Sequence, residues 1–147
     1  MIHKEPLLSE LASAVDAADA RVELQLLKGW HAVEDGRWRW TERQFSVALR
    51  VPQPGKDTVL QLKLALPQSS LDKLQSVTLT ATVNGLSLPE ETYSTAGEHV
   101  FARVVPGGAL AGEVARVDFS LNKALTPGGL DVRELGVIVF SAGFLSM

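Results

Sequence analysis

Residues 60–66 read Leu-Gln-Leu-Lys-Leu-Ala-Leu, so every second residue in this stretch is a leucine. A period of two places the leucines on one face of an extended chain, which is typical of a strand with one buried face. The same alternation recurs on both sides of this stretch, in the segments 44–51, 77–83, 100–105 and 117–121. We therefore predict an all-β domain.

Turn-forming residues separate these segments. Asn84-Gly85 is the strongest short hairpin signal, because both residues adopt positive φ at little cost. Proline and glycine also end the segments before residues 52 and 106. The nearly all-apolar run 136–145 predicts a central strand buried on both faces. With about eight strands at regular spacing, we predict a two-sheet antiparallel sandwich of jelly-roll-like type.

Residues 6–20 follow a different period. Pro6 suits the first position of a helix, where its missing N–H costs nothing. Leu7, Leu11 and Val15 recur every four residues and mark one apolar face. We predict an N-terminal α-helix here, which covers a sheet edge or contacts another subunit. A period-two strand is predicted to follow it at residues 21–28.

Length and composition limit the class of protein. The 147 residues predict one domain overall, with the helix in residues 1–20 and the sandwich in residues 21–147. A net charge of −3 with scattered basic residues argues against nucleic-acid binding. The lack of cysteine excludes disulfides and cysteine-ligated metals. Because there is no signal-like start and no apolar run near the ~20 residues of a membrane helix, we expect a cytoplasmic location without a membrane span.

The sequence shows no pattern typical of a catalytic or metal site. His3, His31 and His99 lie far apart and share no metal-ligand spacing. The acidic pairs have no neighbours that indicate a raised pKa, so solvated faces or salt bridges are favoured for them. We therefore predict a protein that is not an enzyme and that has no cofactor and no metal.

All three tryptophans lie in residues 29–40, which read Gly-Trp-His-Ala-Val-Glu-Asp-Gly-Arg-Trp-Arg-Trp. Two of them stand at i and i+2, so in a strand they share one face, and Arg37 and Arg39 take the other. Paired indoles form either a platform for a sugar ring or a plug in the core, and the plug is slightly favoured. An ion pair between Glu34 and Arg37 is also predicted. The candidate ligand-binding residues are Trp30, His31, Glu34, Arg37, Trp38 and Trp40.

A second notable stretch, Thr-Pro-Gly-Gly-Leu-Asp-Val-Arg-Glu-Leu-Gly-Val, spans residues 126–137. Asp131 is suited to accept hydrogen bonds from backbone N–H groups two residues further on. Arg133 offers a fork of donors to a carboxylate. Because both precede an apolar strand, we predict that they lock a structural turn.

The two stretches together resemble the sandwich modules attached to bacterial glycosyltransferases and to other enzymes of surface-polysaccharide assembly. The resemblance spans residues 29–144 and rests on an opening Gly-Trp-His-x-x-Glu with Arg-Trp-Arg-Trp-Thr and a closing Asp-x-Arg-Glu-Leu-Gly. It implies an accessory, non-catalytic, carbohydrate-related role, with a glycan or a glycan-assembly protein as partner. The alternative is a protein-binding or self-assembling domain, homo-oligomeric through the helix at residues 6–20.

Overall fold

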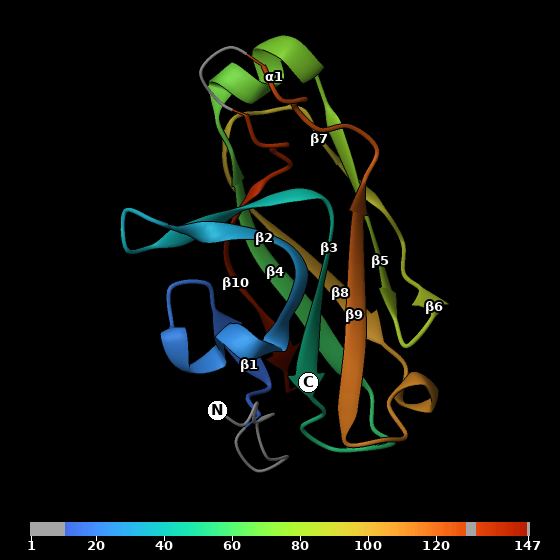
Figure 1. Ribbon diagram of the computed structural model, residues 1–147. Helices are drawn as coiled ribbons and strands as arrows, with labels where there is room; N and C mark the ends of the chain where they lie inside the picture. The colour runs from blue at the N-terminus through green and yellow to red at the C-terminus, as the bar shows by residue number, and fades with distance from the viewer. Residues whose placement is uncertain (1–10, 129–131, 147) are drawn as a thin grey trace.

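The computed structural model describes residues 11–128 and 132–146 (Figure 1). The described chain is mostly β, and none of its helices is long and apolar enough to cross a membrane. The helical elements are η2 (Ala20–Gln25), α1 (Gln68–Leu74) and η3 (Gly107–Ala109). The strands are β1 (Ala14–Asp16), β2 (Leu26–Glu34), β3 (Trp38–Arg50), β4 (Thr58–Leu66), β5 (Val77–Val83), β6 (Leu86–Ser87), β7 (Glu91–Tyr93), β8 (Gly97–Val105), β9 (Val114–Leu121) and β10 (Ile138–Leu145).

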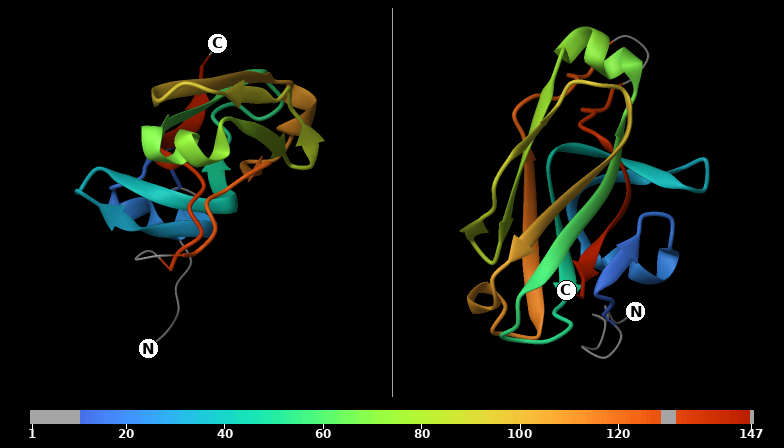
Figure 2. Two further views of the ribbon diagram at one scale, coloured as in Figure 1. Left: turned by 90° about the horizontal axis from the view of Figure 1, so that it is seen from above. Right: turned by 180° about the vertical axis from the view of Figure 1, so that it is seen from behind.

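The strands form one connected antiparallel sheet in the order β6-β5-β9-β3-β10-β4-β8. β1 adds to β10, β2 adds to β3, and β7 adds to β5. The sheet curls, so that β5 and β9 lie across the core from β4 and β8 (Figure 2). The all-β prediction is therefore confirmed, and the facing halves are consistent with a two-sheet sandwich.

The core lies between the two halves and is filled from alternate positions of the strands. On β4, the four leucines of residues 60–66 are almost completely buried. On the facing half, β5 buries residues 77, 79, 81 and 83 in the same cluster. Full burial of one leucine side chain stabilises a fold by about 1.5–3 kcal/mol. The period-two pattern thus accounts for the core of both halves.

β3 belongs to both halves of the sheet. Near its start, Trp40 stands opposite Ile138 of β10, whereas residues 44–50 pair with β9. The strand passes from one half to the other at residues 42–44, which are exposed. β2 runs antiparallel to β3, and their shared tip projects from the body of the molecule (Figure 1).

The N-terminal helix predicted for residues 6–20 is wrong over its described part. Residues 11–20 contain β1, in which Val15 stands opposite Ala142 of β10 and is buried. Val15 therefore finds its apolar partner at a sheet edge and not on a helix face. Residues 6–10 lie outside the described residues.

The strand predicted at residues 21–28 begins only at Leu26, because η2 precedes it. The side chain of Asp19 accepts a hydrogen bond from the Arg21 N–H at 2.9 Å, which caps the first turn of η2. Val22 and Gln25 are buried and stand three residues apart. That spacing matches the three-residue turn of a 3₁₀ helix.

β10 is central, but the prediction that both of its faces are buried is wrong. The strand lies between β4 on one side and β3 and β1 on the other. Val139 points into the core, whereas Ile138 and Phe140 are partly exposed. Residues 14–16, which belong to the predicted N-terminal helix, instead pair with β10 as β1 and extend the sheet.

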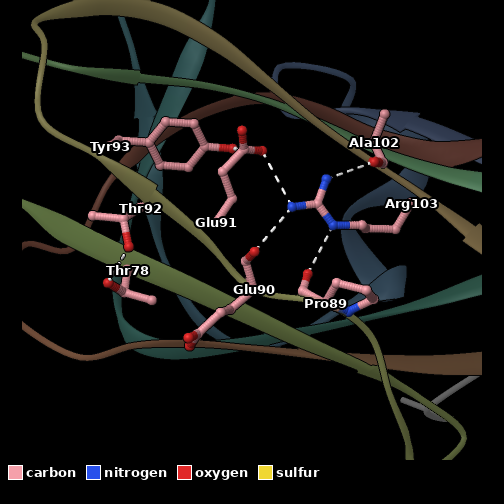
Figure 3. A network of polar contacts seen from close by, with 8 residues as sticks. All are labelled: Thr78, Pro89, Glu90, Glu91, Thr92, Tyr93, Ala102 and Arg103. Atoms are coloured by element: carbon pink, nitrogen blue, oxygen red, sulfur yellow. Dashed lines mark hydrogen bonds and ion pairs between the residues drawn. The ribbon is translucent and has the colours of Figure 1, made fainter.

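A polar network joins β7 and the chain before it to β8 (Figure 3). Arg103 donates from Nε to the Pro89 carbonyl at 2.8 Å and from Nη2 to the Glu90 carbonyl at 3.1 Å. The Tyr93 hydroxyl donates to Glu91 Oε1 at 3.1 Å, and burial, followed by this hydrogen bond, raises the pKa of Tyr93. Because β7 pairs with β5 and β8 pairs with β4, the network ties the two halves together at this edge.

Candidate functional site

The β2–β3 hairpin carries most of the predicted site residues, and a two-residue turn forms its tip. Asp35 and Gly36 both have positive φ, at 54° and 60°, as in a type I′ turn. The Arg37 N–H donates to the Glu34 carbonyl across the turn at 3.1 Å. Asp-Gly is a hairpin signal of the same kind as Asn84-Gly85. The turn was therefore accessible from the sequence, although no turn was predicted at Asp35-Gly36.

Trp30 lies on the core side of the hairpin. Its ring meets that of Phe45 edge-on at 5.2 Å, and its Nε1–H donates to the Ser46 carbonyl at 2.8 Å. The preceding Gly29 has a φ of +80°, and a Cβ there would lie 2.0 Å from the Gln44 carbonyl oxygen. The backbone at this point therefore accepts only glycine, and Trp30 packs against the core.

Trp38 and Trp40 lie on the opposite, outward face of the hairpin. Burial alternates along the start of β3: Arg39 and Thr41 are buried, whereas the two tryptophans are partly exposed. Neither indole belongs to the apolar side chains that form the core or pack against it. Both indoles therefore present surface to solvent outside the core.

Two residues of β10 extend this outward surface. Ile138 stands opposite Trp40, and the ring of Phe140 meets that of Trp38 edge-on at 6.2 Å. We call Trp38, Trp40, Ile138 and Phe140 the aromatic patch. The Arg37 guanidinium lies 5.6 Å from the Trp38 ring centroid and covers part of that indole. Within the described residues, neither an aromatic ring nor a guanidinium covers Trp40 in this way.

Arg39 supports the patch from the buried side. Its Nε donates to the Ala17 carbonyl at 2.8 Å and its Nη1 to the His31 carbonyl at 3.1 Å. Its Nη2 lies 3.4 Å from Glu23 Oε1. These partners satisfy a guanidinium that is otherwise costly to bury. Arg39 lies on the face opposite the tryptophans, as the spacing predicts, but its supporting contacts come from distant segments that no local pattern indicates.

The closing motif of the sequence meets the hairpin directly. His31 Nε2 lies 2.7 Å from the Glu134 carbonyl, and Arg133 Nη1 donates to Glu34 Oε1 at 2.8 Å. The predicted ion pair between Glu34 and Arg37 is wrong, because Glu34 pairs with Arg133 and Arg37 lies over Trp38. Arg133 lies 99 residues from Glu34 along the chain, so no local sequence pattern predicts this contact, which forms only when the chain folds.

The same closing segment also joins the start of β3. The Gly136 N–H donates to the Thr41 carbonyl at 2.7 Å, and the Val137 N–H donates to Thr41 Oγ1 at 3.2 Å. The opening and closing motifs therefore form one contact surface. Asp131 lies outside the described residues, so its role in locking a turn stays a prediction. Arg133 was predicted to lock the same turn, and the structure shows that it also makes a long-range contact with Glu34.

The described residues contain no group of three or more histidine, cysteine, aspartate or glutamate side chains that could hold a metal ion. The predicted site residues thus fall into three kinds. Trp30 packs inward, and His31 and Glu34 contact the closing motif. Trp38 and Trp40 face outward, with Arg37 over the ring of Trp38.

No family model and no curated protein matches the chain. Among solved structures, a family GH115 4-O-methyl-α-glucuronidase with specificity for decorated arabinogalactans matches with a TM-score of 0.59 and 11% identity, over 93% of this chain. A Paenibacillus sp. cycloisomaltooligosaccharide glucanotransferase matches with a TM-score of 0.50 and 9% identity, over 91% of this chain. This chain spans only 18% of the length of each of those two proteins. At these identities the likeness shows a shared fold alone.

Carbohydrate-binding modules also occur among the structural neighbours. A CBM36 module in complex with calcium and xylotriose matches with a TM-score of 0.47 and 10% identity. That match covers 90% of this chain and 98% of the module.

Proposed function

We propose that this chain is a non-catalytic, carbohydrate-binding-like accessory module whose aromatic patch stacks against a sugar ring. The observation that carries the proposal is the position of Trp38 and Trp40 outside the core, partly exposed and on one face. A pyranose ring has an apolar C–H face and hydrated hydroxyls at its rim. A partly exposed indole with polar neighbours matches both parts of such a ring.

The supports of the patch favour binding. Its residues stand on two paired strands, and strands position a site more precisely than loops do. The ring of Phe140 contacts that of Trp38 edge-on. Arg39, which stands between the two tryptophans in β3, holds the strand in place by its hydrogen bond to the Ala17 carbonyl on the opposite face. A surface that is already ordered loses less conformational entropy when a ligand binds.

The proposal extends to the setting of the module. The motifs of residues 29–41 and 131–136 support an association with bacterial glycan handling, next to a glycosyltransferase or another enzyme of surface-polysaccharide assembly. The fold also occurs within a glucuronidase and a glucanotransferase. A single jelly-roll-like domain and a cytoplasmic location belong to the same proposal, the location because a chain without cysteine suits a reducing compartment.

The alternative function, a protein-binding or self-assembling domain, was to use a helix at residues 6–20. Over residues 11–20 that contact surface does not exist, because β1 pairs with β10 and turns follow it. Homo-oligomerisation therefore stays a prediction without support from this segment.

A glycan array probed with the 147-residue chain tests the proposal, followed by calorimetry with any glycan retained. We expect Trp40→Ala to weaken that binding by about tenfold or more, which corresponds to about 1.4 kcal/mol. Leu86→Ala on β6 is the matched control, since it removes another partly exposed apolar side chain, 41% exposed, and should leave binding unchanged.

Two results would overturn the proposal. One is an array on which no glycan is retained. The other is a retained glycan whose affinity is unchanged in both Trp38→Ala and Trp40→Ala. The non-catalytic part fails separately, if the purified chain turns over a glycoside or a nucleotide sugar and one substitution abolishes that turnover.

A further inference from the structure

The crossing of β3 between the two halves of the sheet creates a hollow on the molecular surface. Its volume is about 350 Å³, and its lining residues are Lys28, Gly29, Glu42, Arg43, Gln44 and Glu134. β2 stays close to β3 on both sides of the hollow, with Lys28 opposite Ser46 and Trp30 opposite Thr41. Between those two pairs, β3 has three more residues than β2, and its residues 42–44 bend outward.

A second hollow of about 360 Å³ adjoins the first, because Lys28 and Gln44 line both. It lies on the outward face of β5, β9 and β3, where Thr80, Ser120 and Gln44 stand in one row across the three strands. In the next row Ser46 is completely buried, with Lys28 of β2 opposite it and Arg116 Nη2 3.4 Å from its hydroxyl oxygen. Lys28 of β2 therefore borders both hollows. We call the two hollows together the polar groove.

The polar groove offers donors and acceptors that the protein itself does not use. Within the described residues, the side chains of Gln44, Thr82 and Ser120 make no hydrogen bond to another protein group, although all three line the groove. Amide and hydroxyl groups both donate and accept, as sugar hydroxyls do. Each hollow alone has the size of a small-molecule site, about 300–1,000 Å³.

The charges of the groove favour a neutral ligand. Glu42 and Glu134 bring carboxylates to the lining, against the cations of Lys28 and Arg43. The third carboxylate of the lining, Asp118, is paired with Arg116 Nε at 3.1 Å, so the charges of the groove nearly balance and favour neither an anion nor a cation. Of the two cations, Arg43 is already engaged, because its Nε donates to the Leu121 carbonyl at 2.9 Å.

We infer that the polar groove is a second carbohydrate site, which binds a short neutral oligosaccharide through hydrogen bonds to Gln44, Thr82 and Ser120. The inference rests on the proposed function, that the chain binds glycans. It differs in place and in mode, because the aromatic patch lies beside β10 and acts by stacking. The groove lies beside β9, and Phe119, one of its lining residues, has its ring buried in the core, where it offers no face for stacking.

NMR titration of the 147-residue chain with cellotriose, xylotriose and mannotriose tests the inference. We expect one of these neutral trisaccharides to shift the amide signals of residues 28, 44, 80, 82 and 120. The double variant Gln44→Ala/Ser120→Ala should then weaken its binding about tenfold or more. Gln61→Ala, an amide on the outward face of β4, is the matched control and should change binding less than twofold.

A second variant covers the case in which the double variant folds poorly. Thr82→Val removes one groove hydroxyl, keeps a β-branched side chain in β5, and should still weaken binding severalfold. Shifts confined to the aromatic patch, with full affinity in both groove variants, would refute the groove and leave the proposed function intact. Shifts confined to the groove, unchanged by Trp40→Ala, would support the groove and refute the patch. No shift with any of the three sugars would overturn the groove, while the array of the preceding section still tests the patch.

Discussion

Trp30 and Trp40 belong to the same hairpin and have opposite surroundings. Trp30 stands opposite the buried Thr41, contacts Phe45 and donates its Nε1–H to a backbone carbonyl. Trp40 stands opposite Ile138 and lies outside the core. The difference shows that strand pairing decides which tryptophan packs against the core and which one stays outside it.

Removal of Trp30 should have the largest effect on stability. We expect Trp30→Ala to lower the free energy of unfolding by about 3–5 kcal/mol, because a large side chain leaves a cavity against Phe45 and an unpaired carbonyl at Ser46. Urea denaturation followed by far-UV circular dichroism measures the loss. A loss in the free energy of unfolding smaller than that caused by Trp40→Ala would contradict the difference drawn between the two residues.

Arg39 should have the next largest effect. Arg39→Ala leaves the carbonyls of Ala17 and His31 without their donors, and we expect a loss of about 1–3 kcal/mol. Arg39→Lys restores the charge but not the fork of donors, so it should recover only part of the loss. Full recovery by lysine in thermal unfolding would show that charge, and not geometry, holds the hairpin.

The contact between Glu34 and Arg133 should contribute less. Both side chains are about a third exposed, at 37% and 33%, and exposed ion pairs contribute about 0–1 kcal/mol. We expect Glu34→Gln to cost less than about 1 kcal/mol, with a smaller cost in high salt because salt screens exposed charges. Denaturation at two salt concentrations checks this, and a loss that salt does not reduce would contradict it.

Trp40 should have the smallest effect on stability. Trp40 is partly buried but packs outside the core, so its removal opens no cavity there, and we expect Trp40→Ala to lower the free energy of unfolding by about 1 kcal/mol or less. Fluorescence tests the comparison: a variant that keeps only Trp40 should be quenched by acrylamide more strongly than one that keeps only Trp30, because Trp30 packs against the core. Equal quenching of the two would place both indoles in the same environment and refute the patch.

The sequence predicted the core better than the site. The alternation of residues 60–66 and 77–83 was sufficient to predict which of their side chains are buried, because a strand with one apolar face turns that face to the core. Residues 11–20 were mispredicted because Val15 can be buried equally well on the apolar face of a helix or in a strand at the edge of a sheet. Its pairing with Ala142 decides between them, and no local pattern contains that pairing.

The site shows the same limit. The spacing of Trp38 and Trp40 predicted a shared face, but the spacing alone does not tell which face of the sheet is buried. The Asp35-Gly36 turn was accessible from sequence, since both residues favour positive φ. The contact of His31 with Glu134 was not, because 103 residues separate the two.

The central position of β10 has a consequence for the order of folding. Its partners are β1, β3 and β4, so the sheet joins its two halves only when residues 138–145 take their place. Such pairings between distant segments raise the relative contact order, and folding slows as contact order rises. During synthesis, the strands made before β10 wait with a gap in the sheet until residues 138–145 have emerged. The hairpin that carries the tryptophans gains its contacts with Arg133 and Glu134 only about 100 residues after it was made.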